Sequence, residues 1–186
     1  MTIEKNRRFS YLALLSAVAI TLNLLESIYI GPIFGVLRLG LANIAALLAL
    51  KLLGQKEMLI VNVMRVVIGN LLRGTIFGST FWISGAGVVL SSLVMILLDK
   101  LDSSLLFTSI CGSIAHSSGQ VLIVAFLYQQ AGMAAILPYL LLGSIPTGIL
   151  IGIVARLVIK HIKPLRKDND KGDWLLSFYF GVGGRA

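Results

Sequence analysis

The sequence predicts an all-α membrane protein, a bundle of about six transmembrane helices. Hydrophobic residues make up 57% of the chain and charged residues only 13%, and the mean hydropathy is +0.93. Soluble domains carry about twice this share of charged residues. We therefore expect one transmembrane domain over residues 1–163, followed by a cytoplasmic tail over residues 164–186.

The helices are expected where apolar residues form long runs, with five or seven crossings as alternatives to six. These runs are Phe9–Ile30, Leu39–Leu53, Met58–Thr75, Trp82–Leu98, Leu105–Tyr128 and Met133–Ile159. The first follows a charged leader without a convincing cleavage site, so a retained helix is expected. A bilayer core of about 30 Å needs about 20 helical residues, so the second and fourth runs are short and are expected to be tilted or partly embedded. The stretch GSTFWISGAG, residues 78–87, predicts a re-entrant or broken helix.

Lysine and arginine gather on one side of the predicted bundle, which favours a multi-pass protein of the cell membrane with both termini cytoplasmic. That side carries Lys5, Arg7, Arg8, Lys51, Lys56, Lys100, Lys160, Lys163, Arg166 and Lys167. Only Arg38 and Arg73 lie near the opposite loops. The net charge of +8 thus indicates contact with anionic lipid head groups. No basic helix or aromatic platform supports nucleic-acid binding.

Ionisable residues inside the apolar runs are candidates for a binding site, because a charge at the bilayer centre costs about 3 to 10 kcal/mol. In the third run, Asn62, Arg65, Gly69 and Arg73 are spaced as one helical stripe. The stripe predicts a polar lining of a ligand cavity, with Arg73 the strongest candidate. Arg65 has an alternative structural role, pairing with Glu26 or with a helix C-terminus.

His116 lies near the middle of the fifth run, close to Ser113, Ser117 and Gln120. It is expected either to form an inter-helix hydrogen bond or to contact a ligand. A metal site is the weakest alternative, since no second histidine or cysteine stands at ligand spacing. The single cysteine, Cys111, is expected to serve packing.

The first helix is predicted to present two different faces. Asn23 and Glu26 share one face near the outer end, whereas Ala13 and Ala17 lie about 130° away around the helix. One helix is thereby expected to serve two partners.

Signatures of catalysis are missing from the sequence. The aspartates lie in predicted cytoplasmic segments and form no magnesium-binding clusters for a diphosphate, and no Walker A motif is present. The chain is therefore expected not to be an enzyme and to need no cofactor, and any use of ATP is expected to come from another subunit.

Five segments together resemble a known family over roughly residues 10–160. They are RLGLANI, VNVMRVVIGNLLRG, SGAGVVLSSLVM, SIAHSSGQ and LPYLLLGSIPTGILIG. The chain resembles the Gx transporter family, whose members are also labelled heptaprenyl diphosphate synthase component I. That family is similar to the S components of energy-coupling factor (ECF) importers. Ser117 is a departure, because the family pattern has an asparagine after the histidine.

The resemblance implies a substrate-binding S component for a vitamin or cofactor, docked on a membrane T component that two ATPase subunits drive. The small pair Ala13 and Ala17 matches the AxxxA face by which S components dock. The alternative is a membrane-bound component of polyprenyl diphosphate or quinone synthesis, as the family label suggests. A membrane scaffold or a channel is a third class.

The expected ligand site combines the polar residues of the outer half with one aromatic residue. Its members are Glu26, Arg38, Asn43, Arg65, Arg73, Trp82, His116 and Gln120. Because Arg38, Arg65 and Arg73 are expected to converge there, a small amphipathic anion is predicted as the ligand. Its apolar body is expected to be covered by Tyr29, Phe34, Phe77 and Trp82.

Overall fold

The computed structural model describes residues 3–30, 40–129 and 137–162, and within these ranges it contains helices and turns but no strand. The all-α fold class is confirmed. The elements are α1 (Ile3–Leu25), the π-helical η1 (Glu26–Ile30), α3 (Asn43–Leu52), α4 (Gln55–Leu72), α5 (Ser79–Lys100), α6 (Leu105–Tyr128) and α7 (Leu137–His161). The expected tail over residues 164–186 lies outside the described residues.

Four of the described helical ranges are long and apolar enough to cross a membrane. They are Lys5–Tyr29, Ser79–Lys100, Leu105–Tyr128 and Leu137–His161. Large apolar side chains such as Leu93, Leu122 and Phe126 are exposed on the outside of these helices. An outer surface of this kind suits lipid, and it is consistent with a multi-pass membrane protein.

Helix α3 is short, as expected for the second apolar run, and it is buried inside the bundle. Its 10 residues span about 15 Å, half of a bilayer core. Eight of them are buried, because the helix is apolar nearly all round and is surrounded by its neighbours. Its side chains pack with Leu15 and Ala19 of α1, Met58 and Val61 of α4, and Ile151 and Ala155 of α7.

The predictions of a short fourth span and of a broken helix at residues 78–87 are wrong. Helix α5 begins at Ser79, directly after Gly78, and runs unbroken for 22 residues. Its small residues serve close packing instead of a break. A Cβ on Gly87 would lie 2.9 Å from the carbonyl oxygen of His116 in α6, so the two backbones meet at this glycine.

Helices α5, α6 and α7 pack through small residues along their whole contact. A Cβ on Gly119 would lie 2.7 Å from the Ala86 carbonyl oxygen, and one on Gly148 would lie 2.8 Å from the Cα of Ile110. Hydrogen bonds join the same faces: Ser109 Oγ donates to the Gly148 carbonyl oxygen at 2.7 Å. These three helices form a tightly packed layer.

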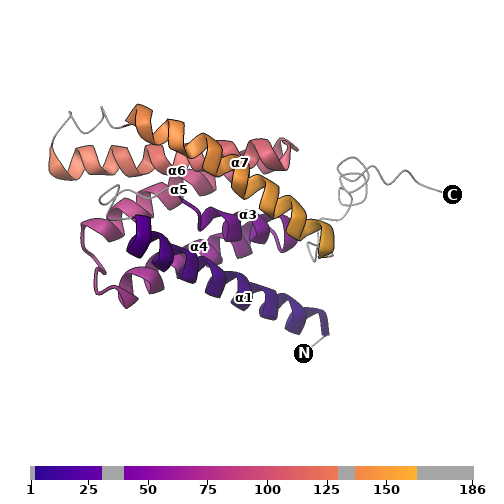
Figure 1. Cartoon of the computed structure of the whole chain (residues 1–186). Helices are drawn as coiled ribbons and strands as arrows, with labels where there is room; N and C mark the ends of the chain where they lie inside the picture. The colour runs from indigo at the N-terminus through magenta and orange to yellow at the C-terminus, as the bar shows by residue number, and fades with distance from the viewer. Residues whose placement is uncertain (1–2, 31–39, 130–136, 163–186) are drawn as a thin grey trace.

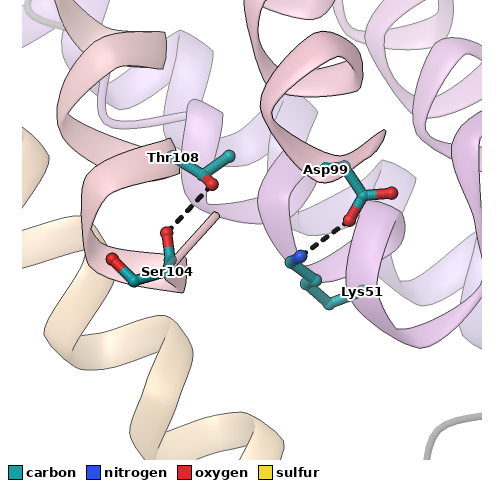
Figure 2. A network of polar contacts seen from close by, with 4 residues as sticks. All are labelled: Lys51, Asp99, Ser104 and Thr108. Atoms are coloured by element: carbon teal, nitrogen blue, oxygen red, sulfur yellow. Dashed lines mark hydrogen bonds and ion pairs between the residues drawn. The ribbon is translucent and has the colours of Figure 1, made fainter. Parts of the chain in front are cut away.

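One end of the bundle holds most of the described charged residues. Helix α1 begins and α7 ends at this end (Figure 1). Arg8 of α1 forms an ion pair with Glu57 of α4 at 2.6 Å. Lys51 of α3 likewise meets Asp99 of α5 at 2.6 Å, close to the start of α6, where Thr108 Oγ1 donates to the Ser104 carbonyl oxygen (Figure 2). We call this the basic end.

Candidate ligand-binding site

A cluster of polar side chains is buried inside the bundle, away from the basic end. Each of its members has at most 4% of its surface exposed: Asn23, Glu26, Asn43, Arg65, Ser84, His116 and Gln120. They come from α1, η1, α3, α4, α5 and α6. A membrane bundle that buries this much polarity in one place has a candidate functional site there.

The cluster surrounds a small cavity. Its wall is formed by Asn23, Glu26, Gly40, Ala42, Arg65, Ser84, Val88 and His116. The volume open to the centre of a water-sized sphere is about 10 Å³, which is room for about one water molecule. Among the described residues, this wall holds one carboxylate, that of Glu26, and one guanidinium, that of Arg65.

Glu26 connects the π-helical turn to the start of α3. Its Oε1 accepts a hydrogen bond from the Gly40 backbone N–H at 2.5 Å. π-Helical turns often occur at functional sites, because the extra residue re-aims a side chain. Here η1 begins with Glu26 itself, and the carboxylate reaches the cavity.

Gly40 allows the chain to enter α3 beside His116. Its φ is +81°, and a Cβ there would lie 3.0 Å from Cδ2 of His116 and 3.1 Å from Nδ2 of Asn43. Both the backbone conformation and the space therefore favour glycine.

Arg65 is hydrogen-bonded to Asn43 through both terminal nitrogens of its guanidinium. Its Nη1 and Nη2 each donate to Oδ1 of Asn43 at 3.1 Å, and its carbonyl oxygen accepts from Nδ2 of Asn23 at 3.3 Å. Arg65 also lines the cavity. The structure thus gives Arg65 a structural contact and a place in the cavity wall, and both of its expected roles stay open.

His116 and Gln120 lie on successive turns of α6 and contact each other, with 2.7 Å between their Nε2 atoms. An amide nitrogen only donates, so Nε2 of His116 accepts and the ring proton sits on Nδ1. Within the described ranges, no three His, Cys, Asp or Glu side chains are grouped so that they could hold a metal ion.

Arg73 lies in a separate network at the end of α4. Its Nε donates to the Gly69 carbonyl oxygen at 2.9 Å, Nη1 to Ser27 Oγ at 2.7 Å and Nη2 to Asn70 Oδ1 at 2.7 Å. Ser27 Oγ in turn donates to the Asn23 carbonyl oxygen. Arg73 is thus linked to the cavity wall through η1 and α1, without being one of the residues that form it.

The expected aromatic cover does not surround this cavity. Trp82 is 53% exposed and packs edge-on against Phe81, while Tyr29 and Phe77 are 70% and 73% exposed. Arg38 and Phe34 lie outside the described residues. Of the three arginines expected to converge, the structure therefore places Arg65 alone in the described cavity wall.

The sequence-based prediction missed four residues of the wall, Gly40, Ala42, Ser84 and Val88. Gly40 precedes Asn43 in RLGLAN, and a glycine before a helix is a weak signal of a close backbone approach. Ser84 lies in the segment 78–87, which was predicted to form a re-entrant or broken helix and not a cavity wall. Val88 has no signal, because an apolar residue in an apolar run does not reveal which cavity it faces.

Ala13 and Ala17 lie on the outer face of α1, and both are exposed. Their neighbours Leu14 and Val18 are exposed as well, whereas Leu15 and Ala19 are buried in the core. The pair is therefore accessible within the described structure, and its role in docking stays a prediction.

Comparison with protein families gives one match, and it covers most of the bundle. The model of the family described as heptaprenyl diphosphate synthase component I matches residues 15–158, a range that includes the buried polar cluster. Comparisons with curated proteins and with solved structures found no match. The match extends over most of the chain, and the chain belongs to the heptaprenyl diphosphate synthase component I family.

Proposed function

We propose that this chain is the substrate-binding component of an ECF-type importer, which captures a small vitamin- or cofactor-like molecule for ATP-driven uptake. The observation that carries the proposal is the buried polar cluster around the cavity. Glu26 and Arg65 are 3% and 2% exposed in a bundle with an apolar outer surface. Charges at such depth are costly, and they are usually retained for a ligand or an ion pathway.

The proposed partners are a membrane T component and two ATPase subunits. The family description, a synthase component I, implies that its members work with another component. Ala13 and Ala17 supply an exposed small-residue face on α1, and small residues let helices of two membrane proteins approach closely. We propose this face as the docking site.

The ligand is proposed to contact Glu26, Asn43, Arg65, His116 and Gln120. Arg38, Arg73 and Trp82 remain proposed contacts at the outer end of the site. The predicted amphipathic anion depends on the convergence of Arg38, Arg65 and Arg73. An anionic group therefore stays a prediction for the part of the ligand that would lie at the outer end, near Arg38 and Arg73.

Co-purification of the tagged full chain from its source membrane tests the proposal. We expect a T component and two ATPase subunits to be recovered with the wild type. The double variant Ala13→Trp/Ala17→Trp should lose them, because two indoles hold the helices apart. A matched control, Val89→Trp/Leu93→Trp on the exposed face of α5, should keep them.

The family description also favours a second candidate function, a membrane-bound component of polyprenyl diphosphate or quinone synthesis. Recovery of a soluble prenyl transferase instead of ATPase subunits would select this function. Recovery of the ATPase subunits with the Ala13→Trp/Ala17→Trp variant would remove the docking assignment.

A further inference from the structure

Three aromatic side chains, Phe77, Phe81 and Trp82, gather where α4 is joined to α5. Phe81 contacts both of the others, with 5.6 Å between its ring centroid and that of Phe77 and 5.5 Å to that of Trp82. Phe77 and Trp82 are largely exposed, and none of the three is part of the described cavity wall. We call this group the aromatic turn. Large apolar side chains that stay uncovered together mark a surface for interaction.

The backbone of Phe77 has a conformation that is unusual for a residue with a large side chain. Its φ is +61°, in the left-handed region that favours glycine. Two hydrogen bonds hold the turn: the Thr75 N–H donates to the Asn70 carbonyl oxygen at 2.9 Å, and the Gly78 N–H donates to the Thr75 carbonyl oxygen at 3.1 Å. Neither bond needs a side chain at position 77, so glycine would fit the same turn with less strain. The strained position therefore points to a role for the ring itself.

The length of α5 sets the depth of the aromatic turn in a membrane. The helix is one of the apolar ranges long enough to cross a bilayer, and its 22 residues span about 33 Å. Its last turn lies at the basic end, where Asp99 is paired with Lys51. A hydrocarbon core is about 30 Å thick. When the Lys100 end lies among the head groups of one leaflet, the start of α5 at Ser79 therefore reaches the boundary of the other leaflet.

The composition of this region suits such a boundary. Residues 74–98 contain no ionisable side chain, so the aromatic turn offers no charge to an ionic ligand or to an ion pair with another protein. It combines aromatic rings with the exposed Ser79. The edge of a bilayer has the same mixed character, because ester carbonyls lie there beside the first methylene groups of the acyl chains. Aromatic rings pack on methylene groups, and an indole N–H donates to a carbonyl.

We propose that the aromatic turn binds the interfacial region of the lipid bilayer at the end of the bundle opposite the basic end. The rings of Phe77 and Phe81 pack on the upper methylene groups, and the indole N–H of Trp82 donates to an ester carbonyl. The left-handed backbone at Phe77 keeps its ring outside the bundle. The protein is thus held in the membrane at both ends, by basic residues at one and by the aromatic turn at the other. This inference goes beyond ligand capture and does not depend on it.

Fluorescence of Trp82 in lipid vesicles tests the proposal. The chain has two tryptophans, and Trp174→Phe leaves Trp82 as the remaining one. This full-length variant is reconstituted into phosphatidylcholine vesicles whose acyl chains carry bromine, a short-range quencher, either close to the ester carbonyl or close to the terminal methyl group. We expect the shallow bromines to quench Trp82 at least about twofold more than the deep ones. Iodide dissolved in the water should quench it weakly.

A second reporter measures the depth of position 77 directly. In a chain that carries Trp82→Phe and Trp174→Phe, the substitution Phe77→Trp introduces a single indole, which should also be quenched most by the shallow bromines. Val89→Trp in the same chain is the matched control, because Val89 is exposed and lies near the middle of α5. This control should be quenched most by the deep bromines.

The strain at Phe77 is tested by comparing Phe77→Gly with Phe77→Ala in detergent. Both variants lack the ring, so they differ in the cost of the backbone conformation. The glycine variant should unfold at the higher temperature, because alanine would carry a Cβ in the left-handed region. Phe81 lies inside α5, where the order should be reversed and Phe81→Ala should be more stable than Phe81→Gly. The same order at both positions would overturn the role assigned to the backbone of Phe77.

Two results would overturn the contact with lipid. Stronger quenching of Trp82 by the deep bromines than by the shallow ones would place the aromatic turn inside the hydrocarbon core. Absence of quenching by either brominated lipid would place it in water, if iodide quenches, or against protein such as a second copy of this chain, if iodide does not. Trp82 is also a proposed ligand contact, and vesicles without ligand or partner subunits measure its lipid contact alone. The outcome is therefore independent of the proposed importer role.

Discussion

Gly40 shows how much one residue without a side chain determines at this site. Its positive φ of +81° and the nearby His116 ring both act against a Cβ, while its backbone N–H is held by Glu26. The residue therefore fixes the distance between η1, the start of α3 and α6. A side chain there would push these three elements apart.

We expect Gly40→Ala to destabilise the fold by about 1 to 3 kcal/mol, from backbone strain and from the contact with His116. Thermal unfolding of the chain in detergent measures it. Gly85→Ala is the control, because a Cβ at Gly85 meets nothing within 4 Å and alanine favours the helix by up to about 1 kcal/mol. Equal unfolding temperatures for the two variants would contradict this account of Gly40.

Residue chemistry allowed a large part of the polar cluster to be predicted. Glu26, Arg65 and His116 stand out because an ionisable side chain in an apolar run needs a polar environment. Arg73 satisfied the same criterion, yet its guanidinium bonds to Gly69, Ser27 and Asn70. Helical spacing gives the face of a residue, but only the tertiary arrangement decides which neighbours take its hydrogen bonds.

At the scale of elements, α3 is the helix on which both the core and the site depend. It is buried on all sides, Asn43 at its start is held by Arg65, and Lys51 in its last turn is paired with Asp99 (Figure 2). The ion pair joins the end of α3 to α5. Helix α3 is thus fixed at both ends by polar contacts and between them by apolar packing.

Lys51→Met should cost about 2 kcal/mol of stability, because it leaves the carboxylate of Asp99 buried without its ammonium. This value lies below that for a fully buried pair, since the Lys51 side chain is 21% exposed. Unfolding in a detergent titration gives the difference from wild type. The double variant Lys51→Met/Asp99→Leu should recover most of the lost stability, because it removes the buried carboxylate as well. The control Lys56→Met, at an exposed lysine, should cost less than about 0.5 kcal/mol.

A double variant no more stable than Lys51→Met alone would show that Asp99 depends on other partners more than on Lys51.

The positions of the helices were predicted better than their lengths. Apolar runs identify α4, α6 and α7 to within a few residues, because hydropathy responds to the lipid environment. Helix α1 begins at Ile3, well before the expected Phe9, because its first turn is charged. The start of α5 was missed, since glycine and serine in a row resemble a break when their partner is unknown. In the structure Gly87 packs against the α6 backbone, and the sequence of α5 alone does not contain that contact.

At the scale of the whole molecule, the basic end predicts how the bundle sits in the membrane. The start of α1 and the end of α7 lie at this end (Figure 1). The turn from α3 to α4 lies there too, with Lys51 and Lys56 beside it and Arg8 bonded to the carbonyl oxygen of Leu53. Positively charged ends of membrane helices stay in the cytoplasm. We therefore predict that the basic end is cytoplasmic.

Labelling with a membrane-impermeant maleimide tests this orientation. Cys111, the single cysteine, is replaced by alanine, and new cysteines are placed at the exposed Lys56 and Ser79. In intact cells, Ser79→Cys should react and Lys56→Cys should react only after permeabilisation. The reverse labelling pattern would show that the basic end faces the outside of the cell.

One helix, α1, carries both the exposed pair Ala13 and Ala17 and a residue of the cavity wall. That residue is the buried Asn23, whose Nδ2 donates to the carbonyl oxygen of Arg65. If occupancy of the cavity moves this helix, both surfaces are thermodynamically linked. Linkage is reciprocal, so a partner that binds the loaded chain roughly tenfold more tightly must also raise the affinity for the cargo roughly tenfold, about 1.4 kcal/mol. In the proposed importer, release of the cargo then requires the T component to prefer the empty chain, and ATP hydrolysis by the ATPase subunits would act on that preference.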